Sequence, residues 1–153
     1  LGTMGYGLPA AIGVSVAHPG ERVVCFTGDG SIQMCIQELA TAKQYGLNPK
    51  IILLNNGFLG MVALWQRKFY GGRCSESVMD VQPDFVKLAE AYGHVGIRVT
   101  TYEELDRALK DCFGKYAGDL VFVDVHIAPE EPVFPMIGPG AGLTEMTLRE
   151  EAK

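Results

Sequence analysis

The fold of this chain is decided by VVCFTGDGSIQMCIQELATAKQYGLNPKIILLNN, which spans residues 23–56. Two apolar and β-branched runs, 23–27 and 51–54, predict strands that end at Gly28 and Asn55. Between them, apolar side chains recur at the spacing of one helix face, and these are Ile32, Cys35, Ile36, Leu39 and Ala40. A strand–helix–strand unit of this length predicts a right-handed crossover between parallel strands.

The rest of the chain continues the alternation of helices and strands. We predict helices over 8–17, over 83–92 and from a capping box at Thr101, and strands over 95–99 and 120–127. A loop followed by a short helix is expected from residue 58 to about residue 70, before the helix over 83–92. The pattern indicates an α/β fold, a three-layer open parallel sheet with helices on both faces.

Length and composition limit the domain organisation and the partners. A chain of 153 residues with 48% hydrophobic residues suits one domain, expected over 1–128, followed by a Pro/Gly-rich tail over 129–153. The chain starts at Leu1 without an initiator Met, so we interpret it as a fragment. A net charge of −5 argues against nucleic acid, and no apolar run approaches the roughly 20 residues of a membrane span. Four cysteines without Cys-x-x-Cys spacing predict reduced thiols and a cytoplasmic location.

A second signal lies where the first two strands end. Gly28-Asp29-Gly30 follows one strand and, after 24 intervening residues, Asn55-Asn56 follows the other. The carboxyl ends of parallel strands meet at the edge where open α/β sheets bind ligands. The Asp29 carboxylate and the Asn56 amide oxygen suit Mg²⁺ or Ca²⁺, and the helix amides after Gly30 favour an anion. Either half alone would be a turn, but the pair at this spacing predicts a metal and diphosphate site.

The chain resembles the thiamine-diphosphate enzymes, whose fingerprint is the same Gly-Asp-Gly and Asn-Asn pair. Within that superfamily it is similar to the carboxy-terminal cofactor domain of the acetolactate synthase (acetohydroxyacid synthase) large catalytic subunit. The resemblance runs from Gly2 to about Gly142. Its first blocks are shared widely in the superfamily, and these are GTMGYGLPAAIG (2–13) and GDGSIQM (28–34). GMV (60–62) with WQ (65–66) is the block that points to acetolactate synthase.

The resemblance implies a role for each matching residue. The side chains of Asp29 and Asn56 and the backbone carbonyl of Phe58 would bind Mg²⁺. Met4 would support the bent form of the cofactor, and the Gly2 carbonyl would accept a hydrogen bond from its amino group. The remaining cofactor contacts would come from glycines and their neighbours around both motifs, namely Gly28, Gly30, Ser31, Gly60 and Met61.

The resemblance also implies two residues of the substrate pocket. Met61 and Trp65 match residues beside that pocket, and Trp65 stands where 2-ketobutyrate is favoured as acceptor. Without the resemblance, Met4 and Trp65 would be interpreted as core packing.

The resemblance also implies what this chain lacks. No catalytic residue is assigned, because the activating glutamate is expected on a separate amino-terminal domain and Glu21 and Glu38 match no motif. The chain is therefore expected to carry half of a site and to be inactive alone.

The implied reaction decarboxylates pyruvate and condenses the hydroxyethyl unit with a second 2-keto acid, in branched-chain amino acid biosynthesis. Pyruvate and 2-ketobutyrate are the implied substrates, and thiamine diphosphate and Mg²⁺ the implied cofactors. FAD can belong to the intact enzyme but would not be bound by this domain alone. The implied partners are the amino-terminal pyrimidine-binding domain of a partner subunit, further copies in a homo-oligomer, and a regulatory subunit.

Two alternative interpretations stay open. Another thiamine-diphosphate enzyme would carry the same fingerprint, such as a benzoylformate- or sulfopyruvate-type decarboxylase or a pyruvate oxidase. Separate-subunit decarboxylases do place the cofactor domain on its own short chain. The second alternative is a non-catalytic module that uses Asp29 and Asn56 only for structural metal binding or subunit assembly. Cofactor binding distinguishes the module from the enzymes, and the effect of replacing Trp65 on acceptor choice distinguishes a synthase from a decarboxylase.

Overall fold

The computed structural model describes residues 2–129 and 132–149, which divide into two compact units. The described residues of 2–57 and 80–127 form the first unit, and those of 58–79 and 128–149 form the second. The predicted division into a domain over 1–128 and a tail over 129–153 stays a prediction.

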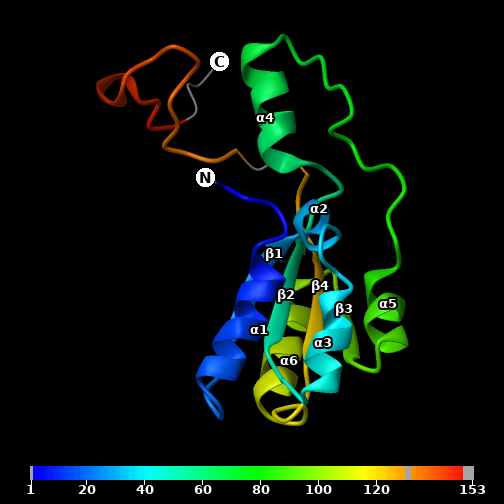
Figure 1. Cartoon of the computed structure of the whole chain (residues 1–153). Coiled ribbons are helices and arrows are strands. Elements are labelled where there is room, and N and C mark those ends of the chain that lie inside the picture. The colour runs from blue at the N-terminus through cyan, green and yellow to red at the C-terminus, as the bar shows by residue number, and fades with distance from the viewer. Residues whose placement is uncertain (1, 130–131, 150–153) are drawn as a thin grey trace. The chain divides into compact units, whose positions relative to one another are not determined.

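The first unit is built on a four-stranded parallel sheet with the strand order β1-β2-β4-β3 (Figure 1). Its strands are β1 (Val24–Gly28), β2 (Lys50–Asn55), β3 (Val95–Val99) and β4 (Val121–His126). Gly28 pairs with Leu54, and Asn55 pairs with His126. The carboxyl ends of β1, β2 and β4 therefore lie at one edge, and the predicted strands and their parallel pairing are confirmed.

Helices cover both faces of this sheet and make the fold three-layered. They are α1 (Gly7–Ala17), the short α2 (Asp29–Ile32), α3 (Glu38–Gln44), α5 (Phe85–Ala91) and α6 (Tyr102–Phe113). On one face, Leu39 and Phe85 from α3 and α5 pack in a core with Phe122. On the other face, Cys112 from α6 packs in a second core with Val123. Adjacent residues of β4 thus enter opposite cores, which explains why this strand is apolar almost throughout.

The prediction of a single helix between β1 and β2 is wrong. Helix α2 ends at Ile32, a turn follows over 33–37, and α3 begins at Glu38. Through this turn the backbone N–H groups donate to the third preceding carbonyl, as from Cys35 to Ile32. Hydrogen bonds to the third preceding residue wind the backbone more tightly than the 3.6 residues per turn that the prediction assumes. Side chains therefore turn around the axis faster than predicted. Ala40 is consequently exposed, and Ala42 takes the buried position.

The helix start signals are confirmed at one helix and shifted at another. The Thr101 hydroxyl accepts a hydrogen bond from the Glu104 N–H at 3.2 Å, and the Glu104 carboxylate accepts one from the Thr101 N–H, which completes the predicted capping box. Pro83 does not open α5. The side chain of Asp84 caps this helix instead, by accepting a hydrogen bond from the Lys87 N–H at 3.2 Å.

The second unit contains α4 (Gly60–Phe69), the short helix predicted between β2 and α5. Two isolated antiparallel bridges lie in this unit, between Phe58 and Val78 and between Met136 and Thr147. The expected extended tail also contains the 3-10 turn η1 (Leu143–Glu145). Within the described ranges of the chain, no helix combines the length and apolar character needed to cross a membrane.

Candidate metal and diphosphate site

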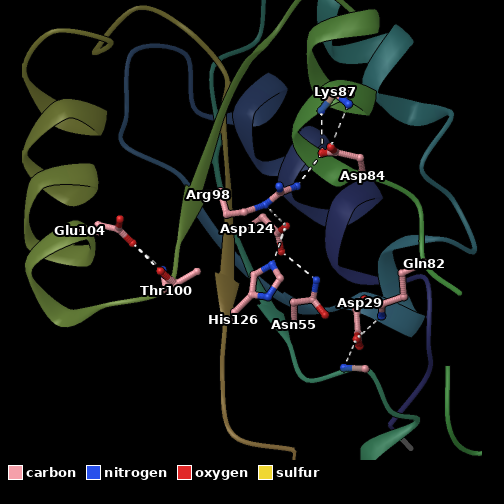
Figure 2. A network of polar contacts seen from close by, with 11 residues as sticks. Asp29, Asn55, Gln82, Asp84, Lys87, Arg98, Thr100, Glu104, Asp124 and His126 are labelled. Carbon is pink, nitrogen blue, oxygen red and sulfur yellow. Dashed lines mark hydrogen bonds and ion pairs between the residues drawn. The ribbon is translucent and has the colours of Figure 1, made fainter. Parts of the chain in front are cut away.

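The first unit brings the two halves of the sequence motif together at the carboxyl edge of the sheet. Asp29 is the first residue of α2, directly after β1, and Asn55 is the last residue of β2. Figure 2 shows Asp29 and Asn55 at this edge, with Gln82 beside Asp29. This is the edge at which open parallel sheets bind ligands. The predicted meeting of the Gly-Asp-Gly and Asn-Asn segments is therefore seen in the structure.

Asp29 is a buried carboxylate, 2% exposed, held by three neutral N–H donors. Its Oδ1 accepts a hydrogen bond from the Gly30 N–H at 2.9 Å. Its Oδ2 accepts one from the Gly57 N–H at 2.8 Å and another from the Gln82 amide at 2.6 Å. Burying a carboxylate is costly unless hydrogen bonds and a cation compensate its charge. These donors supply the hydrogen bonds and fix its orientation, so the carboxylate suits a hard divalent cation.

The two asparagines of the pair have different surroundings. Asn55 is buried, and its amide Nδ2 donates to the Asp124 Oδ1 at 2.9 Å. Its side chain is therefore directed to Asp124, while the half-buried Asn56 follows in the turn that leaves the sheet. Gly57 has φ +73°, a conformation that L side chains rarely adopt, and this turn directs its N–H at Asp29. Of the two asparagines, Asn56 is therefore the one that we still predict to be a metal ligand.

The donor set fits Mg²⁺ better than a transition metal. Among residues 2–129 and 132–149, no group of three or more His, Cys, Asp or Glu side chains is placed to hold a metal ion. A site here would combine the Asp29 carboxylate with amide or carbonyl oxygens. Mg²⁺ usually takes one or two carboxylates and completes its octahedron with phosphate oxygens and water. The residues of this edge therefore fit the implied ion.

The segment before α1 is held by one hydrogen bond to α2 and one to the turn that follows α2. The Gly5 N–H donates to the Ser31 hydroxyl at 3.0 Å, and the Cys35 thiol donates to the Gly5 carbonyl at 3.0 Å. Ser31, a predicted cofactor contact, thus orders the segment that carries two other predicted contacts, Gly2 and Met4. Gly2 is exposed and the Met4 side chain is partly exposed, so ordinary core packing does not account for Met4. A Cβ built at Gly28 meets nothing within 4 Å, which leaves open space beside the motif.

The other predicted contacts lie in the second unit, at and before α4. The Leu59 N–H donates to the Ser77 carbonyl at 2.9 Å, next to the bridge formed by Phe58. Trp65 packs edge-on against Phe69 with 5.2 Å between ring centroids. Met61 is 54% exposed. The roles of Phe58, Gly60, Met61 and Trp65 toward the cofactor and the substrate stay predictions.

A set of polar residues in this region was not identified from the sequence. Figure 2 shows Asp124 among Asn55, Arg98 and His126. The Arg98 Nε lies 3.6 Å from the Asp124 Oδ2, and the His126 Nε2 lies 3.2 Å from the same oxygen. Arg98 also pairs with Asp84 at 2.6 Å. The available signal was a lone aspartate inside the apolar run 120–125, since such a residue must have polar partners from other strands.

The fold and the site together define a class of protein. Open α/β sheets bind their ligands at the carboxyl ends of the strands, and the buried Asp29 carboxylate lies at that edge. The family model described as "Thiamine pyrophosphate enzyme, C-terminal TPP binding domain" matches residues 1–125, and the chain belongs to this family.

Curated relatives make the likeness more specific. The chain is 57% identical over 152 residues to the acetolactate synthase large subunit of Buchnera aphidicola subsp. Acyrthosiphon pisum, covering 99% of this chain and 27% of that protein. It is 55% identical over 149 residues to the acetolactate synthase isozyme 3 large subunit of Escherichia coli, covering 97% of this chain and 26% of that protein. The chain thus spans about a quarter of the length of these relatives.

A solved structure supports the fold. The thiamine diphosphate-dependent 4-hydroxybenzoylformate decarboxylase of Rhodococcus jostii RHA1 superposes with a TM-score of 0.76 at 34% sequence identity. The match covers 84% of this chain and 24% of that one. The three-layer α/β fold predicted from the sequence is therefore also the fold of a thiamine-diphosphate enzyme.

Proposed function

We propose that this chain is the diphosphate- and Mg²⁺-binding domain of an acetolactate synthase large subunit. The observation that carries the proposal is the identity of 57% to such a subunit across nearly the whole chain. The buried, neutrally hydrogen-bonded Asp29 supports the metal part of the proposal independently. Family membership and local geometry thus favour the same kind of site.

In this proposal the residues of the chain bind and orient the cofactor. The Asp29 carboxylate, the Asn56 amide oxygen and the Phe58 carbonyl hold Mg²⁺, and Met4 and the Gly2 carbonyl position the thiamine part. The diphosphate is contacted by residues near the two motifs, namely Gly30, Ser31, Gly60 and Met61, and Gly28 is a further cofactor contact. Thiamine diphosphate, when bound, supplies the electron sink that allows a 2-keto acid to lose carbon dioxide.

The proposed reaction of the longer subunit consumes pyruvate and a second 2-keto acid. Pyruvate is decarboxylated, and its hydroxyethyl unit is condensed with pyruvate or 2-ketobutyrate, a step of branched-chain amino acid biosynthesis. The activating glutamate comes from the amino-terminal domain of a partner subunit, so the active form is an oligomer. Met61 and Trp65 line the acceptor pocket.

We also propose a cytoplasmic location and a regulatory partner subunit. All four cysteines are free and three of them are buried, and burial raises the pKa of the Cys25, Cys35 and Cys112 thiols. Protonated, buried thiols suit a reducing compartment. This supports the location without bearing on the reaction.

Product analysis tests the proposed reaction. The longer subunit carrying this chain is supplied with thiamine diphosphate, Mg²⁺ and pyruvate, and acetolactate and acetaldehyde are quantified. Acetolactate as the main product supports the synthase. Acetaldehyde without acetolactate would instead support a decarboxylase, the alternative favoured by the structural likeness to the 4-hydroxybenzoylformate decarboxylase.

Acceptor choice tests the role of Trp65. In a competition between pyruvate and 2-ketobutyrate, Trp65→Leu is expected to lower the share of product made from 2-ketobutyrate. Tyr70→Leu removes a nearby exposed aromatic ring and serves as the matched control. Equal product ratios for the wild type and both variants would contradict the assigned pocket position.

A further inference from the structure

Asp124 is a buried carboxylate in the middle of the polar residues at the sheet edge. It is 1% exposed and lies in β4, which is otherwise apolar until His126. Its Oδ1 accepts the hydrogen bond from the Asn55 amide at 2.9 Å, and its Oδ2 lies 3.6 Å from the Arg98 Nε (Figure 2). A buried ion pair is weak evidence for stability, because an apolar residue of similar volume often stabilises a fold as well. The position of Asp124 therefore needs another explanation.

That explanation lies in what Asn55 holds. The Asn55 side chain is bound by Asp124, and its backbone carbonyl accepts a hydrogen bond from the Ile127 N–H at 2.9 Å. Asn55 is thus fixed at both its side chain and its main chain. Asn56 and Gly57 follow directly, and the Gly57 N–H donates to the Asp29 Oδ2 at 2.8 Å. The position of Asn55 consequently sets where the turn meets Asp29.

A second chain of contacts connects Asp124 to Asp29 from the other side. Arg98 bridges Asp124 to Asp84, the N-cap of α5, with 2.6 Å to Asp84. Two residues before Asp84 along the chain, the Gln82 amide donates to the Asp29 Oδ2 at 2.6 Å. The two routes leave from different carboxylate oxygens of Asp124, and both end on the Asp29 Oδ2. Together with the chain segments 55–57 and 82–84, these contacts form a closed loop between Asp124 and Asp29.

We propose that Asp124 is a positioning residue for the metal-binding turn, acting through Asn55 to fix Asn56 and Gly57 against Asp29. The proposal rests on the function proposed above in its assignment of Asp29 and Asn56 to Mg²⁺. Residues behind metal ligands commonly change metal affinity by about 10- to 100-fold when they are removed.

The test uses Asp124→Asn and its exchange partner in the full chain. In Asp124→Asn, an amide replaces the carboxylate that accepts from Asn55 and faces Arg98, so it cannot present an oxygen to both. The double variant Asn55→Asp with Asp124→Asn reverses the hydrogen bond, because the new amide can donate to the new carboxylate. Asp106→Asn is the matched control, since Asp106 is an exposed carboxylate that pairs with Lys110 on α6.

Two readouts separate positioning from general stability and from the proposed function. The first is the amide proton shift and hydrogen exchange of Gly57 by NMR without metal, compared with amides of α6. The second is Mg²⁺ affinity in the presence of thiamine diphosphate. We expect Asp124→Asn to accelerate Gly57 exchange selectively and to weaken Mg²⁺ by about tenfold or more. The double variant Asn55→Asp with Asp124→Asn should restore part of the slow Gly57 exchange and part of the Mg²⁺ affinity. Asp106→Asn should change neither the exchange nor the affinity.

Each result has a distinct meaning. If Gly57 exchange in Asp124→Asn matches the wild type, or accelerates only together with the α6 amides, Asp124 does not position the turn and the proposal is overturned. If the wild-type longer subunit that carries this chain binds no Mg²⁺ while Gly57 exchange responds selectively, the metal assignment is wrong and the structural link remains. If the wild type binds Mg²⁺ and Asp124→Asn binds it equally well, the proposal is also overturned.

Discussion

At the scale of single residues, Gly96 marks the closest approach of β3 to α5. A Cβ built at Gly96 would lie 2.8 Å from the Val86 carbonyl oxygen and 3.1 Å from the Val86 Cα. Backbone atoms cannot move aside as a flexible side chain can. The packing of α5 on the sheet, which also places Gln82 and Asp84, therefore depends on a residue without a side chain at this position.

Gly96→Ala is expected to lower the free energy of unfolding by about 1–3 kcal/mol, because it overpacks a tight contact. Urea unfolding followed by circular dichroism measures the change. Gly13→Ala is the matched control, since Gly13 lies inside α1 and its added Cβ meets nothing within 4 Å. This control should raise the free energy of unfolding by about 0.5–1 kcal/mol. Equal effects of the two substitutions would contradict the close approach.

Residues close to a strand end were predictable, and their distant partners were not. Asp29 and the Asn55-Asn56 pair follow recognisable strands, so their meeting could be inferred from the spacing alone. Gln82 and Asp124 contact Asp29 and Asn55 across 53 and 69 positions of the sequence. No local pattern encodes such contacts, because they depend on strand order. The strand predicted over 120–127 agrees with β4, but the sequence alone assigns no role to Asp124.

At the scale of elements, the capping box that opens α6 couples helix stability to pH. The pKa of Glu104 lies below its ordinary value of 4.5, mainly because the Thr100 N–H donates to its carboxylate at 2.8 Å. The Thr100 hydroxyl and the Thr101 N–H donate to the same oxygen. The folded state therefore binds this proton more weakly than the unfolded state. The stabilisation is complete above pH 4.5 and is lost as the pH falls through the lower folded-state pKa.

We expect Glu104→Gln to make stability less dependent on pH in the acid range. The variant keeps a side chain able to accept from the capping N–H groups, but it cannot titrate. Urea unfolding at pH 7 and in steps down to about pH 3 should show the two proteins converging as the pH falls. Glu103→Gln, in the same helical turn but outside the capping box, is the control. Parallel curves for the wild type and Glu104→Gln would contradict the assignment.

Elements with strong local signals were predicted well. The wrong prediction, a single helix between β1 and β2, came from assuming a regular 3.6-residue hydrophobic period there. Strands β1, β2, β3 and β4 are apolar or β-branched runs with clear ends, and the Thr101 capping box identified α6. The spacing from Ile32 to Ala40 fitted a helix, yet the chain there forms tight turns with Cys35 bonded to the segment before α1. That tertiary contact overrides a periodicity that is only a statistical preference.

At the scale of the whole molecule, the first unit leaves apolar surface on β1. Val24 and Phe26 are 40% and 70% exposed, on an edge strand of the sheet. Apolar edge strands favour pairing with further chains. We therefore expect the chain to self-associate as its concentration rises, measured by sedimentation velocity. Phe26→Lys should weaken the association more than Tyr45→Lys, which changes an aromatic ring of similar exposure after α3. A wild type that stays monomeric at all concentrations would contradict this expectation.

The division into two units and the exposed β1 surface could not be predicted from the sequence. Both depend on which segments pack together across long separations, and hydrophobic periodicity reports only which face of an element is apolar. The parallel three-layer class was predictable, because alternating strand and helix signals allow few arrangements. The order of strand and helix signals along the chain therefore indicated the class of fold, while strand order in the sheet determined which residues surround Asp29.

The central claim is that Asp29 contributes to a Mg²⁺-dependent diphosphate site. Calorimetric titration of thiamine diphosphate into this chain and into the longer subunit, with Mg²⁺, with EDTA and with Asp29→Ala, tests it most directly. The account predicts binding that requires Mg²⁺ and is abolished by EDTA or by Asp29→Ala. Binding of undiminished affinity in EDTA or in Asp29→Ala would contradict it.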